Sequence, residues 1–158
     1  MTFTNTVEIN APITRVFDLV DDDQNIKLWM DGLEETLYPE GKNPVNPVGT
    51  RFTQQIREGS RVATYEGRVI AYEKPNLLAI TIGNSQFEMQ VVYRFTAKGA
   101  WTWLDYSATM TRGSLFTKLM SKLFAPLTCR ILDRQMKKLK ELAETEMATE
   151  FTAKVFAA

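Results

Sequence analysis

Three tyrosines and one glutamine are the residues of this chain best placed to act on a bound molecule. Tyr65, Tyr93 and Tyr106 lie in segments where apolar and polar residues alternate, and each falls on the apolar side, as does Gln54. Because successive side chains of a strand point to opposite faces, this spacing predicts that all four face the interior of a sheet. There a phenol could orient a ligand oxygen, or it could be a core residue whose hydroxyl bonds to the backbone or to water.

Gln54 bears on the same question of ligand contact or core packing, because a buried amide costs free energy unless it is hydrogen-bonded. We expect it to be bonded either by Tyr65 across a hairpin or by a ligand. Glu66 and Arg68 alternate with Tyr65, so they are predicted to lie on the outer face.

The residue types that most enzymes use are missing. The chain has no histidine, which excludes imidazole acid–base catalysis, a histidine-containing triad and a histidine metal site. Its single cysteine, Cys129, cannot build a metal cluster and is predicted to be a small buried hydrophobe. The eight glycines are scattered singly, so no phosphate-binding loop is present. We therefore predict no catalytic residue, no metal and no cofactor.

An apolar lining surrounds these polar candidates in the predicted arrangement. We expect a cavity of about 300–1,000 Å³, the usual size of a small-molecule site. Trp29 could be a gate, a stacking surface or a plain core anchor at its mouth. The predicted cavity residues are Trp29, Phe52, Gln54, Tyr65, Met89, Val91, Tyr93, Tyr106, Met110, Phe116, Met120 and Phe124.

A long helix near the C-terminus must face that lining. Between residues 113 and 147 apolar residues recur every three or four positions, which indicates a helix with a wide apolar face. At 1.5 Å per residue, about 30 residues span about 45 Å, so the helix needs a broad sheet beneath it. Ser114 is suited to cap its start, and Pro126 predicts a kink or a break near Phe124.

The residues before this helix predict a strand, two short helices and six further strands. Turn residues recur every ten to fourteen positions, which favours antiparallel neighbours. The run Asp21-Asp22-Asp23 would end the first short helix and cap the second. The predicted strands are residues 3–10, 33–38, 51–57, 62–72, 77–82, 87–96 and 101–111, and the short helices are residues 13–20 and 24–30.

Composition limits the class of protein. The 158 residues suit one domain, predicted at residues 1–148 and followed by a frayed tail at 149–158. Lysine plus arginine (19) equals aspartate plus glutamate (19), so no global field favours nucleic acid or an anionic membrane. Lys137, Lys138 and Lys140 form the local basic cluster, which suits a helix C-terminus. With no bilayer-spanning segment and no signal-peptide pattern, the cytoplasm is the expected compartment.

Seven short segments of the chain are similar to segments of a known superfamily and occur in the same order. They are INAP (9–12), VFDLV (16–20), NIKLWMDG (25–32), VGTRF (48–52), YEKPNLL (72–78), GAWTWL (99–104) and LKELAE (139–144). The chain resembles the START-like superfamily, also called SRPBCC or polyketide cyclase/dehydrase-like proteins, over about residues 3–146. The resemblance implies an α+β helix-grip fold. In that fold a seven-stranded curved antiparallel sheet wraps a long C-terminal helix, with two short helices after the first strand.

Three functions are consistent with these features. The first is binding or carriage of a small hydrophobic molecule between sheet and long helix; the resemblance implies lipids, isoprenoid quinones, sterols or aromatic polyketides. The second is a polyketide cyclase- or aromatase-like enzyme that uses the cavity tyrosines. The third is a protein-interaction module or homodimer, for which Trp101 and Trp103, predicted on the outer face, would supply a surface. We expect no nucleic-acid partner and no stable membrane insertion.

Overall fold

The computed structural model describes the backbone of residues 1–157 and the side chains of residues 1–145. The elements follow the predicted order closely. They are β1 (Thr2–Ile9), α1 (Ile13–Asp21), α2 (Asp23–Trp29), β2 (Leu33–Leu37), β3 (Arg51–Glu58), β4 (Arg61–Glu73), β5 (Leu77–Gly83), β6 (Phe87–Lys98), β7 (Trp101–Gly113), α3 (Leu115–Leu123) and α4 (Ala125–Ala157).

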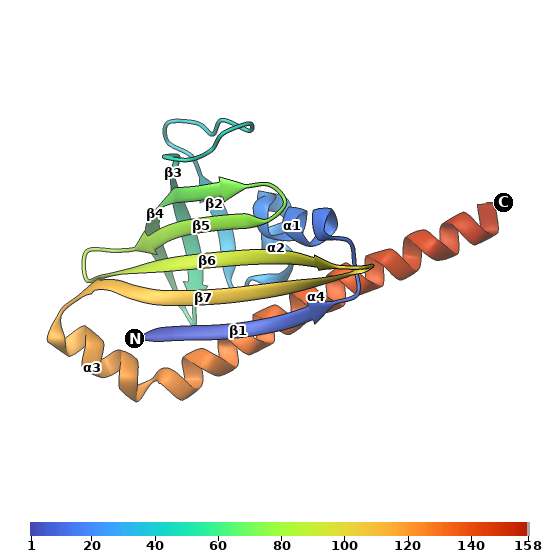
Figure 1. Cartoon of the computed structure of the whole chain (residues 1–158). Coiled ribbons are helices and arrows are strands. Elements are labelled where there is room, and N and C mark those ends of the chain that lie inside the picture. Colours follow the sequence, from blue (N-terminus) through green and yellow to red (C-terminus); the bar gives the residue numbers. More distant parts are fainter. Residues whose placement is uncertain (158) are drawn as a thin grey trace.

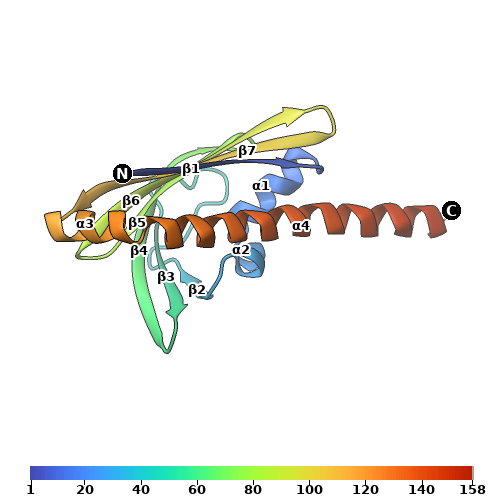
Figure 2. The ribbon, with the colours of Figure 1, turned by 90° about the horizontal axis from the view of Figure 1, so that it is seen from below.

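One antiparallel sheet contains all seven strands, in the order β1-β7-β6-β5-β4-β3-β2. Strands β2 to β7 form a meander of sequence neighbours, and β1 pairs with β7 at the far edge. The sheet bends around α4, which runs lengthwise beneath it, while α1 and α2 lie beside α4 under the same face (Figures 1 and 2). This is the α+β helix-grip fold that the sequence predicts.

Helix boundaries follow the predicted capping residues. The Asp22 carboxylate accepts hydrogen bonds from the backbone N–H groups of Gln24 (2.9 Å) and Asn25 (3.1 Å), which starts α2. Ser114 Oγ accepts one from the Thr117 N–H (3.1 Å), which starts α3. The predicted break near Phe124 is also present, since α3 ends at Leu123 and α4 begins at Ala125. Pro126 then lies in the first turn of α4, where a missing N–H costs little.

The C-terminal helix is longer than the sequence predicts. Its backbone continues past residue 147 to Ala157, so the residues expected to form a frayed tail are helical up to that point. The side chains from residue 146 onward lie outside the described part of the structure. The division into a domain and a tail stays a prediction.

The core lies where α1 and the middle of α4 meet the sheet. Phe17 of α1, Leu104 of β7 and Leu139 of α4 are each fully buried. By contrast, α3 and the first turns of α4 stand clear of this core. Cys129, expected to be buried, is therefore exposed. The helical period indicated a wide apolar face correctly, but only the part of it around Met136 and Leu139 reaches the sheet.

Polar contacts attach the middle of α4 to its neighbours. Arg134 Nε and Lys138 Nζ donate to the Asp31 carboxylate at 2.8 and 2.6 Å. The hydrogen bond from Lys138, and also that from Arg134, lowers the pKa of Asp31 below its usual value of 3.8. Lys140 Nζ donates to the Glu8 carbonyl (2.6 Å) and to Glu144 (2.8 Å). Two lysines of the predicted basic cluster are thus committed to structural contacts.

The two tryptophans predicted on the outer face are half exposed there. Trp101 and Trp103 are 41% and 40% exposed. A lysine ammonium covers each ring: Lys140 lies 5.5 Å from the centre of Trp101, and Lys98 lies 5.0 Å from the centre of Trp103. These cation–π contacts occupy part of the surface, and its use by a partner stays a prediction.

Candidate ligand cavity

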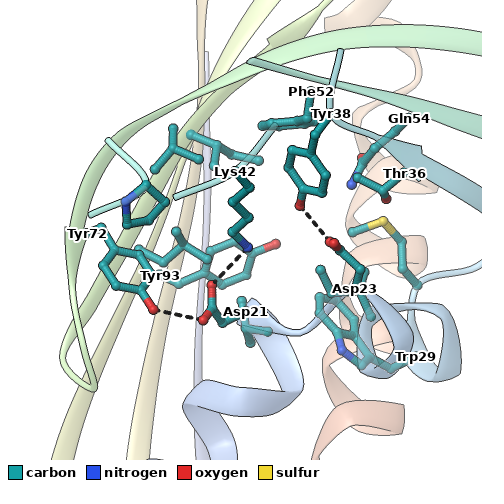
Figure 3. A pocket seen from close by; sticks show the side chains of 17 residues that line it. Asp21, Asp23, Trp29, Thr36, Tyr38, Lys42, Phe52, Gln54, Tyr72 and Tyr93 are labelled. Carbon is teal, nitrogen blue, oxygen red and sulfur yellow. Dashed lines mark hydrogen bonds and ion pairs between the residues drawn. The ribbon is translucent and has the colours of Figure 1, made fainter. Parts of the chain in front are cut away.

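A cavity of about 60 Å³ lies between the concave face of the sheet and the two short helices (Figure 3). Helices α1 and α2 cover one side, strands β2 to β6 form the floor, and the loop at residues 38–50 closes the remaining side. Within the described side chains its lining residues are Val20, Asp21, Asp23, Ile26, Trp29, Met30, Thr36, Tyr38, Lys42, Pro47, Phe52, Gln54, Val69, Tyr72, Leu78, Ile80 and Tyr93. None of these belongs to the long helix, against which the sequence placed the hollow.

The cavity brings together four of the twelve residues nominated from the sequence: Trp29, Phe52, Gln54 and Tyr93. Val91 and Tyr106 are buried nearby, where Tyr106 packs edge-on against Tyr93 with ring centres 5.2 Å apart. Neither of the two lines the cavity.

The other six nominated residues lie toward the α3 end of the molecule. Tyr65, Met89 and Met110 are half-buried on the sheet, and Met120 is half-buried on α3. Phe116 and Phe124 are 71% and 50% exposed, because α3 stands off the sheet. The cavity is therefore smaller than predicted and occupies one end of the expected hollow.

A polar wall made by Thr36 and Gln54 is the most informative feature of the cavity. The two residues are cross-strand partners on β2 and β3, and their side chains lie side by side in Figure 3. Thr36 Oγ1 is buried and has no hydrogen-bond partner in the described part of the chain. The Gln54 side chain is buried as well. Tyr65, which could have bonded it across the hairpin, donates its hydroxyl to Glu58 instead. Of the two predicted partners for Gln54, Tyr65 bonds elsewhere, and a ligand stays a prediction.

Tyr93 supplies a third polar group to the same space. Burial, followed by the charge of nearby Tyr106, raises the pKa of Tyr93 well above its usual value of 10. The phenol is therefore neutral at any ordinary pH and is available as a hydrogen-bond donor. Buried polar groups are nearly always paired, and of these three groups Thr36 Oγ1 is the one that is buried without a partner in the described part of the chain.

Two carboxylates and two further phenols form the mouth of the cavity. Tyr38 donates to Asp23 (2.7 Å) and Tyr72 donates to Asp21 (2.8 Å). Lys42, from the loop, lies 3.7 Å from Asp21. Burial and then the bond to Asp21 raise the pKa of Tyr72 to about 12, and burial and then the bond to Asp23 raise that of Tyr38 further. Both phenols therefore stay protonated and hold their carboxylates in place.

The sequence did not identify these mouth residues. From the sequence, Asp21 and Asp23 were interpreted as the end of one helix and the start of the next, and they have these positions in the structure as well. Tyr72 was not assigned to either face from the sequence; strict alternation from Tyr65, which puts odd-numbered residues inside, would place it outside. A register shift between Val69 and Ala71 reverses the alternation and turns Tyr72 inward. The three consecutive aspartates are the one sequence feature that could have drawn attention to the mouth.

Trp29 had three possible roles, and its contacts favour one of them. Its side chain is 1% exposed, and its indole Nε1 donates to the Leu19 carbonyl at 2.7 Å. This bond ties α2 to α1 and holds the ring as part of the cavity wall. A swinging gate would have to break it, so Trp29 is best described as a core anchor with one face toward the cavity.

Together, the fold and the site define a class of protein. A curved antiparallel sheet around a long C-terminal helix, with an apolar cavity under two short helices, is the arrangement of START-like (SRPBCC) proteins. A family model described as "Polyketide cyclase / dehydrase and lipid transport" matches residues 1–144. The chain belongs to this family. A search of curated proteins finds no match.

Solved structures of the same fold are numerous and distant in sequence. Protein NE0264 from Nitrosomonas europaea superposes with a TM-score of 0.71 and 13% identity, covering 92% of this chain and 96% of its own. TTHA0849 from Thermus thermophilus gives 0.66 and 18%, covering 89% and 95%. StfQ, a di-domain aromatase/cyclase from the steffimycin biosynthetic pathway, gives 0.68 and 17%, covering 92% of this chain and 46% of its own. At these identities the likeness shows the fold alone.

No cluster of potential metal ligands occurs among residues whose side chains the structure describes. Within the same limits, no helix is both long and apolar enough to cross a membrane.

Proposed function

We propose that this protein binds and carries a small hydrophobic molecule that bears a polar oxygen or nitrogen. The observation that supports this most strongly is the buried Thr36 hydroxyl, which lies beside Gln54 in a largely apolar cavity and has no hydrogen-bond partner in the described part of the chain. Such a group costs about 1–3 kcal/mol when unsatisfied, and a ligand that bonds it recovers this free energy on binding. The apolar walls would supply the remaining affinity through burial of the ligand's hydrocarbon surface.

The size of the cavity sets a condition on the proposal. About 60 Å³ holds a few water molecules and is well below the roughly 300 Å³ of a typical ligand site. A lipid, quinone or polyketide therefore needs the cavity to widen. Residues 39–46 are the part of the loop best placed to move, because they lie between Tyr38, which is bonded to Asp23, and the buried Pro47. Among the described side chains, the ion pair that ties them to the helices is the long 3.7 Å pair of Lys42 with Asp21. Such partly exposed pairs contribute about 0–1 kcal/mol, so losing this one is inexpensive. Moving Tyr38 or Pro47 as well would break the bond to Asp23 or expose a buried ring.

The second candidate is a polyketide cyclase-like enzyme. It is favoured by the neutral Tyr93 phenol, which could donate to a developing enolate, and by Asp21 and Asp23, which could accept a proton near the mouth. The aromatase/cyclase StfQ is a structural neighbour in fold. Both carboxylates are, however, already bonded to tyrosines, so this candidate needs a rearranged mouth.

One pair of variants separates the two candidates. Tyr93→Phe removes the phenol that lines the cavity, whereas Tyr106→Phe removes an equally buried phenol that does not. For a carrier, Tyr93→Phe weakens ligand binding by about 0.5–1.5 kcal/mol, the net worth of one neutral hydrogen bond, and Tyr106→Phe leaves it unchanged. Binding is measured by displacement of anilinonaphthalene sulfonate with a fatty acid, a quinone and an aromatic polyketide.

A turnover assay on a poly-ketone substrate completes the comparison. Turnover by the parent protein that falls about 100-fold or more in Tyr93→Phe, with affinity retained, would make the enzyme the correct assignment. Equal loss of binding in both variants would show that the phenols act through packing, and the proposed contact would be wrong.

A further inference from the structure

Helix α3 leaves an apolar face uncovered. Its exposed side chains, continued into the first turn of α4 and called here the outer face, are Leu115 (87% exposed), Phe116 (71%), Leu119 (64%), Leu123 (68%), Phe124 (50%) and Leu127 (54%). Helix α1 has the same length of nine residues and buries four apolar side chains, whereas α3 buries none. Large contiguous apolar patches of this kind mark interaction surfaces.

The contact between α3 and the rest of the protein is made by the other side of the helix. Thr117, Met120 and Ser121 are the half-buried residues there, and Thr117 lies next to Gly113 at the end of β7. The Ser121 hydroxyl bonds back to the Thr117 carbonyl (2.8 Å), so it makes no tie to the sheet. Helix α3 thus rests on the protein by a largely polar side and directs its leucines elsewhere. Figure 1 shows it at one end of the sheet, away from α1 and α2.

The segment of chain that carries the outer face is entirely positive in charge. From residue 106 to residue 132 the sequence has no aspartate or glutamate, and its four charged residues are Arg112, Lys118, Lys122 and Arg130. No ion pair of Lys118, Lys122 or Arg130 occurs among the described side chains. Arg112 donates to the backbone carbonyls of residues 84 and 85, and its cross-strand partner on β6 is Glu88. In contrast, three cations farther along α4 are paired: Arg134 and Lys138 with Asp31, and Lys140 with Glu144.

We propose that the outer face docks on an anionic lipid surface. The helix would lie in the plane of the interface, with its leucines and phenylalanines among the acyl chains and its lysines at the headgroups. An anionic membrane surface attracts this combination of an apolar helix face and unpaired cations. The chain as a whole has zero net charge, so the attraction is local to this end of the molecule.

The same charges disfavour a second copy of the chain as the occupant. Two outer faces packed together would bring Lys118, Lys122 and Arg130 of each copy close to those of the other, with no carboxylate from residues 106–132 to pair with them. Like charges buried in an interface oppose association. The docking goes beyond the proposed function, since it requires neither an occupied cavity nor a particular ligand.

The test is co-sedimentation of the full chain with vesicles. One set contains phosphatidylcholine alone, and the other contains equal parts of phosphatidylcholine and phosphatidylglycerol. We expect binding to the anionic vesicles that weakens at high salt. The variant Leu119→Ser/Leu123→Ser should bind at least about tenfold more weakly, because two side chains no longer insert. Lys118→Glu/Lys122→Glu should lose a similar factor on anionic vesicles.

Matched controls use exposed residues away from α3. Leu28→Ser/Leu37→Ser replaces two exposed leucines, and Lys27→Glu/Lys98→Glu makes the same change of charge. Both should bind as the parent does, and circular dichroism should show every variant folded. If the controls lose as much binding as the α3 variants, the proposal is overturned.

Two further results would also overturn it. One is failure of the parent protein to sediment with anionic vesicles. The other is sedimentation velocity without vesicles that shows a dimer which Leu119→Ser/Leu123→Ser converts to a monomer. That outcome would assign the outer face to an interface between copies.

Discussion

Replacing Thr36 by valine should stabilise the protein in the absence of ligand. Valine has nearly the shape of threonine and favours strands, so the substitution on β2 removes little except a hydroxyl. That hydroxyl is buried without a protein partner among the described side chains, a condition that costs about 1–3 kcal/mol in full. Because the cavity has room for water, we take the lower end and expect the free energy of unfolding to rise by about 1 kcal/mol. The corresponding rise in melting temperature is about 2–4 °C.

Thr102 provides the matched control. It also lies in a strand and its hydroxyl is also buried, but that hydroxyl donates to the Ala11 carbonyl at 2.7 Å. Thr102→Val removes that hydrogen bond and leaves the Ala11 carbonyl without this partner, so it should destabilise the protein by about 1–3 kcal/mol. The same chemical change is thus expected to have opposite signs at the two positions.

Urea denaturation followed by tryptophan fluorescence measures both variants, with the slope of the transition as a check on two-state behaviour. Thr36→Val should in addition bind the ligand more weakly than the parent does. If Thr36→Val lowers stability about as much as Thr102→Val, the Thr36 hydroxyl has a structural partner. The argument that the polar wall of the cavity awaits a ligand would then fail.

Three further predictions concern the core, acid stability and the loop. Leu139→Ala should lower the free energy of unfolding by about 2–5 kcal/mol, because Leu139 is fully buried. Leu123 is 68% exposed, so Leu123→Ala should change this free energy by less than about 0.5 kcal/mol. Similar values for the two variants would contradict the assigned core. The lowered pKa of Asp31 stabilises the fold above pH 3.8, and this contribution is lost as the pH falls through the folded-state value. Asp31→Asn should therefore lower the melting temperature at neutral pH, with the difference from the parent shrinking below about pH 4; a constant difference would exclude the linkage. Lys42→Ala removes the pair with Asp21 and should speed ligand association in stopped-flow experiments, with stability changed by at most about 1 kcal/mol; an unchanged rate would show that this loop is not the entry.

Much of the fold could be predicted because it rests on local patterns. Alternation located the strands, and the capping side chains of Asp22 and Ser114 located helix starts. Pro126 located the break between α3 and α4. Each of these acts over a few residues, so the sequence displays it directly.

The site was harder to predict, because it depends on which surfaces meet. Alternation placed Phe52, Gln54 and Tyr93 on the cavity side. A register shift in β4 brought in Tyr72, which the sequence had left unassigned and which strict alternation from Tyr65 would place outside. A register shift of one residue reverses the face of the sheet toward which every later side chain of that strand points. Likewise, the helical period showed that residues near Phe116 form an apolar face without showing whether the sheet covers it.

Native mass spectrometry of the protein purified from its own source would test whether it carries a hydrophobic molecule. The account predicts a complex heavier than the chain by the mass of one such molecule. An extract of the denatured protein should contain that molecule, with a hydrocarbon body and a polar oxygen or nitrogen. Thr36→Val/Tyr93→Phe, folded by circular dichroism, should retain less of it. A bare chain mass, together with no binding of fatty acids, quinones or polyketides in titration, would contradict the account.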